Sequence, residues 1–149
     1  MVSSISGLRT FPFLAVYSAS KFALEAISNG LRYELRPFNI RVVLIEPGNF
    51  NTRAGINMHY PGRVRSGSPH VSSDPLYARL IEKGRETGKN LRFGNAQDVA
   101  RAIADAAEAE DPAPRYLIGK DAEELVALTP DAFERMIEET MSLPEDRSS

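Results

Sequence analysis

The run "IRVVLIEPG" at residues 40–48 constrains the fold of this 149-residue chain more than any other stretch. It is almost continuously apolar, rich in β-branched side chains, and closed by Pro-Gly. A strand with one solvated face alternates apolar and polar residues, whereas a strand buried on both faces reads as a continuous apolar run. Strands of the second kind belong mainly to parallel sheets that are covered by helices. The run therefore predicts a central strand of an α/β fold.

The residues before this strand predict a helix. Apolar side chains recur there at spacings of three and four, at Leu24, Ile27, Leu31 and Leu35. Such spacing places them on one face of a helix, and Pro37 ends the pattern. A helix that is followed by a buried strand again indicates a parallel sheet.

Three helices and one strand are predicted downstream of a long loop at residues 53–73, which shows no sustained period. Each helix follows a polar cap, and the caps are Asp74, Asn95 and Thr129. The expected inward faces are Leu76, Leu80 and Ile81, then Val99, Ile103 and Ala107, then Phe133, Met136 and Ile137. "PRYLIG" at 114–119 predicts the strand. Four phenylalanines are expected in the core, Phe11, Phe13, Phe22 and Phe38.

Composition excludes several classes of protein. With 42% hydrophobic and 26% charged residues, the chain is typical of a globular protein, and no apolar run approaches the roughly 20 residues of a membrane helix. Cysteine is absent, which removes disulfides and thiolate metal sites. The start of the chain has no signal-peptide pattern, so we expect a cytoplasmic location.

Charge is distributed unevenly along the chain. Residues 1–97 carry 13 basic and 6 acidic side chains, whereas residues 98–149 carry 5 and 14. The basic half contains no long run of like charges and no arginine-rich helix, so no nucleic-acid partner is predicted. We expect the two halves to attract each other, or the basic half to attract an anionic ligand.

The stretch "SSISGLRTFPFLAVYSASK" at residues 3–21 holds the candidate catalytic residues. Tyr17 and Lys21 are four residues apart, so on a helix their side chains share one face, about 5–6 Å apart at Cβ. A neighbouring ammonium stabilises a phenolate and prepares the tyrosine for the proton transfer that carbonyl reduction and alcohol oxidation require. Such a pair also arises by chance in a chain with five tyrosines and four lysines. The stretch can equally be a loop that feeds a helix.

Other polar residues are explained better without catalysis. Ser3 and Ser6 are expected to be turn residues, and Glu46, near the strand end, is expected to be a structural carboxylate that pairs locally. His59 and His70 have no partner at metal-ligand spacing, so no metal site is predicted.

Ser4 adds weight to the pair, because it lies 13 residues before Tyr17, and "PGNFNT" closes the buried strand. In these features the chain resembles the short-chain dehydrogenase/reductase family, which has the same Tyr-x-x-x-Lys spacing, a serine at that distance upstream and Pro-Gly-x-x-x-Thr after the next strand. The resemblance continues through "YSASKFALEAISNGLRYEL" and "IRVVLIEPGNFNT", and more loosely through "QDVARAIADA" and "PRYLIGKDA". "EPGNF" and "LRYEL" look most like the branch that acts on 3-hydroxybutyrate, retinol and steroids.

This resemblance implies a Rossmann-type doubly wound parallel sheet and an enzyme that interconverts a small alcohol and a carbonyl compound by hydride transfer. It implies that Tyr17 is the general acid/base and that Ser4 hydrogen-bonds the substrate oxygen. Lys21 would support the tyrosine and hold the nicotinamide ribose.

The same resemblance implies NAD or NADP as the cofactor. Tyr17 and Lys21 would line its nicotinamide end, and Pro47 and Gly48 would let the backbone approach the ring. Thr52 would bond the carboxamide or the cofactor phosphates.

A dinucleotide-binding fold also needs a glycine-rich turn after its first strand, which places the pyrophosphate at a helix N-terminus. The ten glycines form no such motif. Residues 1–149 therefore resemble the carboxy-terminal, catalytic half of the family's domain, and we expect the isolated chain to be inactive. The alternative is a non-catalytic remnant that acts as an interaction or structural module. The sequence does not decide the oligomeric state, and a homo-oligomer is one of the alternatives.

Residues 53–93 are expected to form a lid over the substrate, because a long unpatterned loop and a short helix come directly after the predicted cofactor edge. This segment carries 8 basic and 3 acidic side chains. That excess of positive charge favours an anionic substrate.

Overall fold

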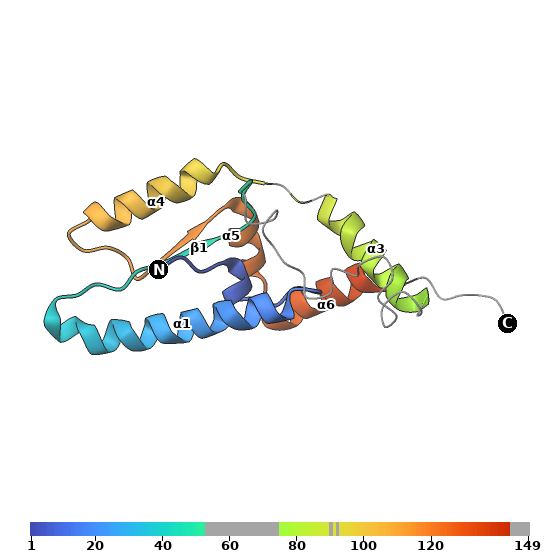
Figure 1. Ribbon diagram of the computed structural model, residues 1–149, viewed down its shortest axis with the longest axis horizontal. Helices are drawn as coiled ribbons and strands as arrows, with labels where there is room; N and C mark the ends of the chain where they lie inside the picture. The colour runs from blue at the N-terminus through green and yellow to red at the C-terminus, as the bar shows by residue number, and fades with distance from the viewer. Residues whose placement is uncertain (53–74, 90, 92, 144–149) are drawn as a thin grey trace, which may run out of the picture.

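The computed structural model describes residues 1–52, 75–89, 91 and 93–143 (Figure 1). The described elements are η1 (Ile5–Gly7), α1 (Ala15–Leu35), η2 (Arg36–Phe38), β1 (Leu44–Pro47), α3 (Pro75–Lys89), α4 (Ala96–Glu108), β2 (Arg115–Ile118), α5 (Lys120–Ala127) and α6 (Pro130–Met141). The predicted loop at residues 53–73, with its two histidines, lies outside the described residues, as does the predicted cap Asp74.

β1 and β2 form a parallel sheet, in a register that places Leu44 opposite Arg115. At its other edge β1 forms a parallel bridge between Ile45 and Val2. The backbone N–H of Ser3 donates to the carbonyl of Ile45 at 2.8 Å. The prediction of a buried central strand in a parallel sheet is confirmed, although only Leu44–Pro47 of residues 40–48 form a regular strand.

Helices cover the strands from both sides. In Figure 1, α4 lies on one side of the strands and α1 on the other. α4 packs on β1 and β2, and α5 packs on β2. The buried hydrophobic side chains of these elements and of η1 are Ile5, Leu44, Ile45, Ala106 and Ala122, and α6 buries Phe133. Burial of a large aliphatic side chain stabilises a fold by about 1.5–3 kcal/mol, so the strands and the helices that cover them stabilise one another. A parallel sheet covered by helices on both sides is the arrangement of a Rossmann-type fold.

The helix α1 is the one predicted before the strand, and it half-buries Leu24, Leu31 and Leu35 of the predicted apolar stripe. Its buried residues are Ser18, Glu25 and Ser28, whereas Ile27 of the predicted apolar stripe is 56% exposed. The small serine side chains let α1 pack closely on the amino-terminal segment, where Ser28 Oγ lies 2.8 Å from Met1 Sδ. The apolar spacing therefore predicted the helix and most of its half-buried stripe correctly, but not the polar residues that α1 buries most deeply.

Two of the predicted caps are confirmed. Asn95 Oδ1 accepts from the backbone N–H of Gln97 at 3.0 Å at the start of α4, and Thr129 Oγ1 accepts from Ala132 N at 3.3 Å at the start of α6. Phe133 of α6 is buried as expected.

Several predicted inward positions face solvent. Leu76 of α3 and Ile103 of α4 are exposed, and α4 buries Ala106 instead. Of the four phenylalanines expected in the core, Phe13, Phe22 and Phe38 are exposed. Only Phe11 packs inward, edge-to-face on Phe133 with 5.5 Å between the ring centroids.

The helix α5 was not predicted. It begins directly after Gly119, which has a φ of 109°, a left-handed conformation that favours glycine. Its eight residues are fewer than the window over which helical periodicity can be read. Among the described residues, no helix is both long enough and apolar enough to cross a membrane.

Candidate active site

Three parallel segments end on the same side of the sheet, and the candidate residues Ser4 and Gly48 follow directly after two of them. Ser4 follows the segment that pairs β1 at Val2, Gly48 follows β1, and Gly119 follows β2. Ligands of open parallel sheets bind outside the carboxyl ends of the strands. The topology therefore brings Ser4 and the Pro47–Gly48 turn to the edge where such a site is expected.

Ser4 is the N-cap of η1. Its Oγ accepts from the backbone N–H of Ser6 at 3.2 Å, and the side chain is buried. Because the hydroxyl oxygen is used as an acceptor, its hydrogen remains available to a substrate oxygen. Ser6 lies inside η1, which agrees with its interpretation as a turn residue, whereas Ser3 Oγ is buried with no hydrogen-bond partner among the described residues.

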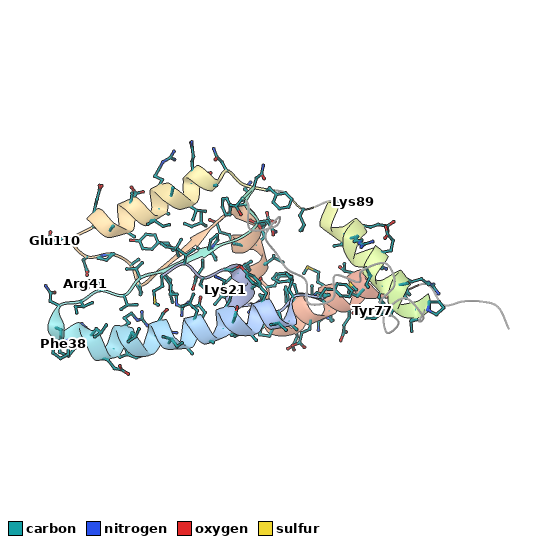
Figure 2. The ribbon with its side chains drawn as sticks, in the orientation of Figure 1. Lys21, Phe38, Arg41, Tyr77, Lys89 and Glu110 are labelled. Carbon is teal, nitrogen blue, oxygen red and sulfur yellow. The ribbon has the colours of Figure 1, made fainter. Side chains whose placement is uncertain are left out.

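Tyr17 and Lys21 lie on one face of α1, as their spacing predicts. The Lys21 Nζ is 5.6 Å from the centroid of the Tyr17 ring and donates to the carbonyl oxygen of Val2 at 3.1 Å. The ammonium is thereby held between α1 and the amino-terminal segment that pairs with β1 (Figure 2). Both side chains are half-buried, so they are accessible to a ligand at this edge.

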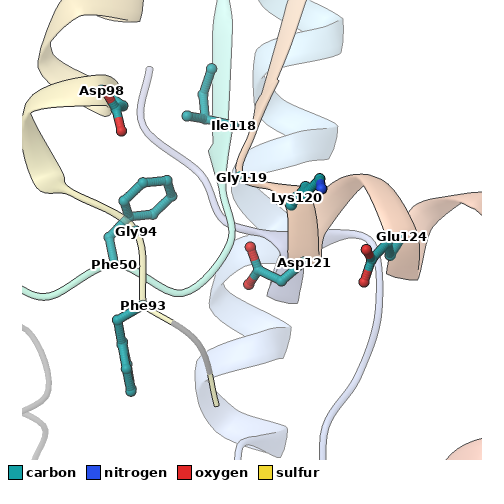
Figure 3. A pocket seen from close by; sticks show the side chains of 9 residues that line it. All are labelled: Phe50, Phe93, Gly94, Asp98, Ile118, Gly119, Lys120, Asp121 and Glu124. Carbon is teal, nitrogen blue, oxygen red and sulfur yellow. The ribbon is translucent and has the colours of Figure 1, made fainter.

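The Pro47–Gly48 turn is held by β2 and by a side chain of α5. Gly48 N donates to the carbonyl of Ile118 at 2.8 Å. Asp121 Oδ2 accepts from both the backbone N and the Nδ2 of Asn49, at 2.7 and 2.9 Å. Figure 3 shows Asp121 pointing from α5 toward the coil that follows β1.

Phe50 continues this turn against the segment that precedes α4. Gly94 N donates to Asn49 O at 2.8 Å, and Asn51 N donates to Gly94 O at 3.2 Å. Phe50 and Asp121 also line a cavity of about 310 Å³ between α4 and α5 (Figure 3). Thr52, the remaining predicted cofactor residue, is exposed at the end of this described segment.

A second polar cluster joins α1 to both strands. Arg115 Nη1 contacts Glu25 Oε2 at 2.7 Å and also Glu46 Oε1, and its Nη2 donates to Asn29 Oδ1 at 3.2 Å. Burial, followed by the nearby charge of Glu25, raises the pKa of Glu46 against the opposing effect of Arg115. This arrangement agrees with the interpretation of Glu46 as a structural carboxylate.

Comparison with known proteins identifies the family. The sequence pattern of the short chain dehydrogenases matches residues 1–59. A probable short-chain type dehydrogenase/reductase VdlC of Helicobacter pylori is 37% identical over an alignment of 133 positions, which covers 85% of this chain and 45% of that protein. The mitochondrial D-beta-hydroxybutyrate dehydrogenase of Mus musculus is 30% identical over 77% of this chain and 36% of its own length.

A solved structure agrees with the sequence comparison. A short-chain dehydrogenase from Streptomyces avermitilis superposes with a TM-score of 0.64 and 30% identity, over 93% of this chain and 48% of that one. The chain belongs to the short-chain dehydrogenase/reductase family. It spans about half the length, or less, of these relatives.

Ser4, Tyr17 and Lys21 were predicted from their spacing, and the Pro47–Gly48 turn was predicted as the cofactor edge; their roles remain predictions. Asp121 and Gly119 were not predicted, although the "GKDA" that follows β2 carried a signal: a glycine at a strand end and an acidic residue in the first helical turn. Within the described residues, no group of three or more histidine, aspartate or glutamate side chains is placed to hold a metal ion.

Proposed function

We propose that this chain carries the catalytic half of an NAD(P)-dependent oxidoreductase that interconverts an alcohol and a carbonyl compound. The observation that carries the proposal is the position of Lys21, whose ammonium lies beside the Tyr17 ring while it is anchored to the carbonyl of Val2. Ser4 follows Val2 by two residues, at the same edge of the sheet. A phenol, an ammonium and a hydroxyl are therefore presented by two adjoining segments.

In carbonyl reduction, the Tyr17 hydroxyl would donate its proton to the carbonyl oxygen of the substrate. Lys21 would stabilise the phenolate that remains, because an ammonium beside the ring favours the negative charge. Ser4 would donate a hydrogen bond to the same oxygen, since its own oxygen is engaged by Ser6 N. In alcohol oxidation, the phenolate of Tyr17 would take the proton back.

The nicotinamide end of NAD(P) fits the residues present. An ammonium has three donors, and Lys21 uses one of them on Val2, so two remain for the hydroxyl groups of a ribose. The Pro47–Gly48 turn and Thr52 would border the nicotinamide ring and its carboxamide. When bound, NAD(P)H supplies the hydride.

The described residues do not offer an equivalent place for the pyrophosphate. The turn from β2 into α5 has the required order of strand, glycine and helix, but the carboxylate of Asp121 lies against it and would repel a phosphate. We therefore expect that these 149 residues alone do not bind NAD(P)H tightly.

A fusion protein tests the proposal. It joins this chain to the part of the Streptomyces avermitilis dehydrogenase that the chain does not match, and is called the fusion protein below. NADH and NADPH are titrated by fluorescence into the isolated chain and into the fusion protein. Acetoacetate is the first carbonyl probe, because one relative is a hydroxybutyrate dehydrogenase and the predicted lid is basic.

We expect the fusion protein to bind one cofactor at micromolar concentration and to oxidise it when a carbonyl substrate is added. The isolated chain should do neither. A folded fusion protein that binds neither cofactor would contradict the proposal and favour a non-catalytic interaction module. Micromolar binding by the isolated chain as a monomer would show that the pyrophosphate site lies within these 149 residues.

A further inference from the structure

Asp121 is the side chain around which the turn after β1 is arranged. One of its oxygens accepts two hydrogen bonds from Asn49, one from the backbone and one from the side chain. The two residues are 72 positions apart in sequence, so the contact ties the end of β1 to the start of α5. Hydrogen bonds to a charged acceptor are stronger than those between neutral groups.

Two glycines make room for this carboxylate. A Cβ placed on Gly48 would lie 2.6 Å from Asp121 Cγ, and a Cβ on Gly119 would lie 2.6 Å from Asp121 Oδ1. Both distances are far shorter than a van der Waals contact. A side chain at position 48 would therefore displace the Asp121 carboxylate, whatever binds on the open side of the turn.

Capping alone does not account for the contact. Asp121 lies in the first turn of α5, where a negative charge is favourable, but Glu123 lies in the same turn and remains exposed. Of these two carboxylates, Asp121 is the one that accepts a hydrogen bond from the backbone of the turn after β1. Glu123 therefore serves as a matched control that shares the charge and the helix position.

We infer that Asp121 is a positioning residue for the nicotinamide end of the cofactor. Its carboxylate fixes Gly48 and Asn49, and thereby the edge against which the ring would lie. This inference rests on the proposed function. It assigns the turn's geometry to a side chain of α5 rather than to the Pro-Gly sequence alone.

The first measurement follows the turn itself, in the isolated chain and without cofactor. Amide hydrogen exchange at Asn49 is recorded by NMR for Asp121→Ala, Asp121→Asn and Glu123→Ala. Loss of a hydrogen bond to a charged group predicts exchange about 10- to 100-fold faster in Asp121→Ala. Asp121→Asn keeps an acceptor oxygen and should recover most of the protection, and Glu123→Ala should match the wild type.

The second measurement follows the cofactor, in the fusion protein. Asp121→Ala should raise the KM for NAD(P)H about tenfold, which corresponds to the loss of one such interaction. The KM for the carbonyl substrate should stay within about twofold, and Asp121→Asn should restore the cofactor KM. A purely structural role would lower the amount of folded enzyme without separating the two KM values.

The two measurements keep the inference apart from the proposed function. Unchanged exchange at Asn49 in Asp121→Ala would overturn the inference, and so would faster exchange with an unchanged cofactor KM. If Asp121→Ala does not fold, Asn49→Ala removes the side-chain donor alone and is read in the same assays. A wild-type fusion protein that uses neither cofactor would overturn both proposals, and the exchange data would then describe only a structural contact.

Discussion

The two ends of the β1–β2 pair are joined to the helices by different means. At the amino end of β2, one long cation, Arg115, reaches Glu25 on α1 and Glu46, the third residue of β1. At the carboxyl end, two glycines leave room for the Asp121 carboxylate beside the backbone. Its contacts there are with Asn49 and Gly48, and neither residue carries a positive charge.

We expect this difference to separate variants that affect stability from variants that affect the proposed activity. Long side chains can bridge layers with little demand on the backbone, so the Arg115 cluster suits a part of the fold that only has to hold together. A turn fixed by backbone hydrogen bonds and close approach has little freedom to move, which suits the edge where a ligand must be positioned. Variants at the two ends should therefore fail in different assays.

The largest effect is expected from Tyr17→Phe in the fusion protein. The change removes only the transferable proton, so kcat should fall about 10²- to 10⁴-fold, while the Kd for the cofactor should change by less than about twofold. Stopped-flow or steady-state oxidation of NAD(P)H measures the first and fluorescence titration the second. Tyr33→Phe, on the exposed end of the same helix, is the control. A Tyr17→Phe variant that keeps more than about a tenth of kcat would contradict the proposal that Tyr17 is the general acid/base.

The next effect concerns the amino end and should appear in stability alone. Arg115→Met leaves Glu25 and Glu46 buried without their cation, and breaking a buried pair costs about 3–5 kcal/mol. Because the Arg115 side chain is 35% exposed, solvent screening should reduce the loss to about 2–3 kcal/mol. Urea denaturation measures the free energy of unfolding.

Arg41→Met is the matched control, since Arg41 pairs with Asp111 on the surface. Exposed pairs are worth about 0.2–1 kcal/mol. Equal losses in the two variants would mean that the Arg115 cluster is no more than another surface pair.

A smaller effect tests the turn at the carboxyl end. In Gly48→Ala, the new methyl group would meet the Asp121 carboxylate, and overpacking of this kind costs about 1–3 kcal/mol. The same substitution in an Asp121→Ala background should cost less, with a coupling of about 0.5–3 kcal/mol. Four urea titrations complete the cycle. Additive losses would show that something other than Asp121 requires glycine at this position.

The fold could be predicted where the signal is local. The apolar run at residues 40–48, the proline after α1 and the polar caps Asn95 and Thr129 each act on neighbouring residues, and each gave an element that the structure contains. The candidate triad was also found locally, because Ser4, Tyr17 and Lys21 lie on adjoining segments. Their catalytic roles remain predictions.

Long-range contacts could not be predicted in the same way. Arg115 and Glu25 are 90 residues apart, and no periodicity in one sequence indicates that they meet. That contact explains one polar residue on the buried side of α1: Glu25 is buried because Arg115 neutralises it, and an apolar pattern cannot indicate such a residue. The contact between Asp121 and Asn49 escaped prediction for the same reason.

The smallest effect is a pH dependence of the free energy of unfolding in the Arg115 cluster. It tests whether Glu46 acts only as an ionised partner of Arg115. Burial raises the pKa of Glu46 above its ordinary value of 4.5. Below that pH the side chain is protonated in both the folded and the unfolded chain. Above it, the unfolded chain loses the proton first, so the folded state binds more protons and this residue's contribution to stability falls as pH rises through the raised pKa.

Glu46→Gln removes this titration and keeps an acceptor for Arg115. The free energy of unfolding is measured by urea denaturation at several pH values. As pH rises above 4.5, its value for the variant should increase relative to its value for the wild type. Glu123→Gln removes an exposed carboxylate from α5 and should run parallel to the wild type. A constant difference between Glu46→Gln and the wild type would mean that Arg115 outweighs burial and keeps Glu46 ionised. The amino end would then be an ordinary ion-paired cluster with no pH-dependent component from this residue.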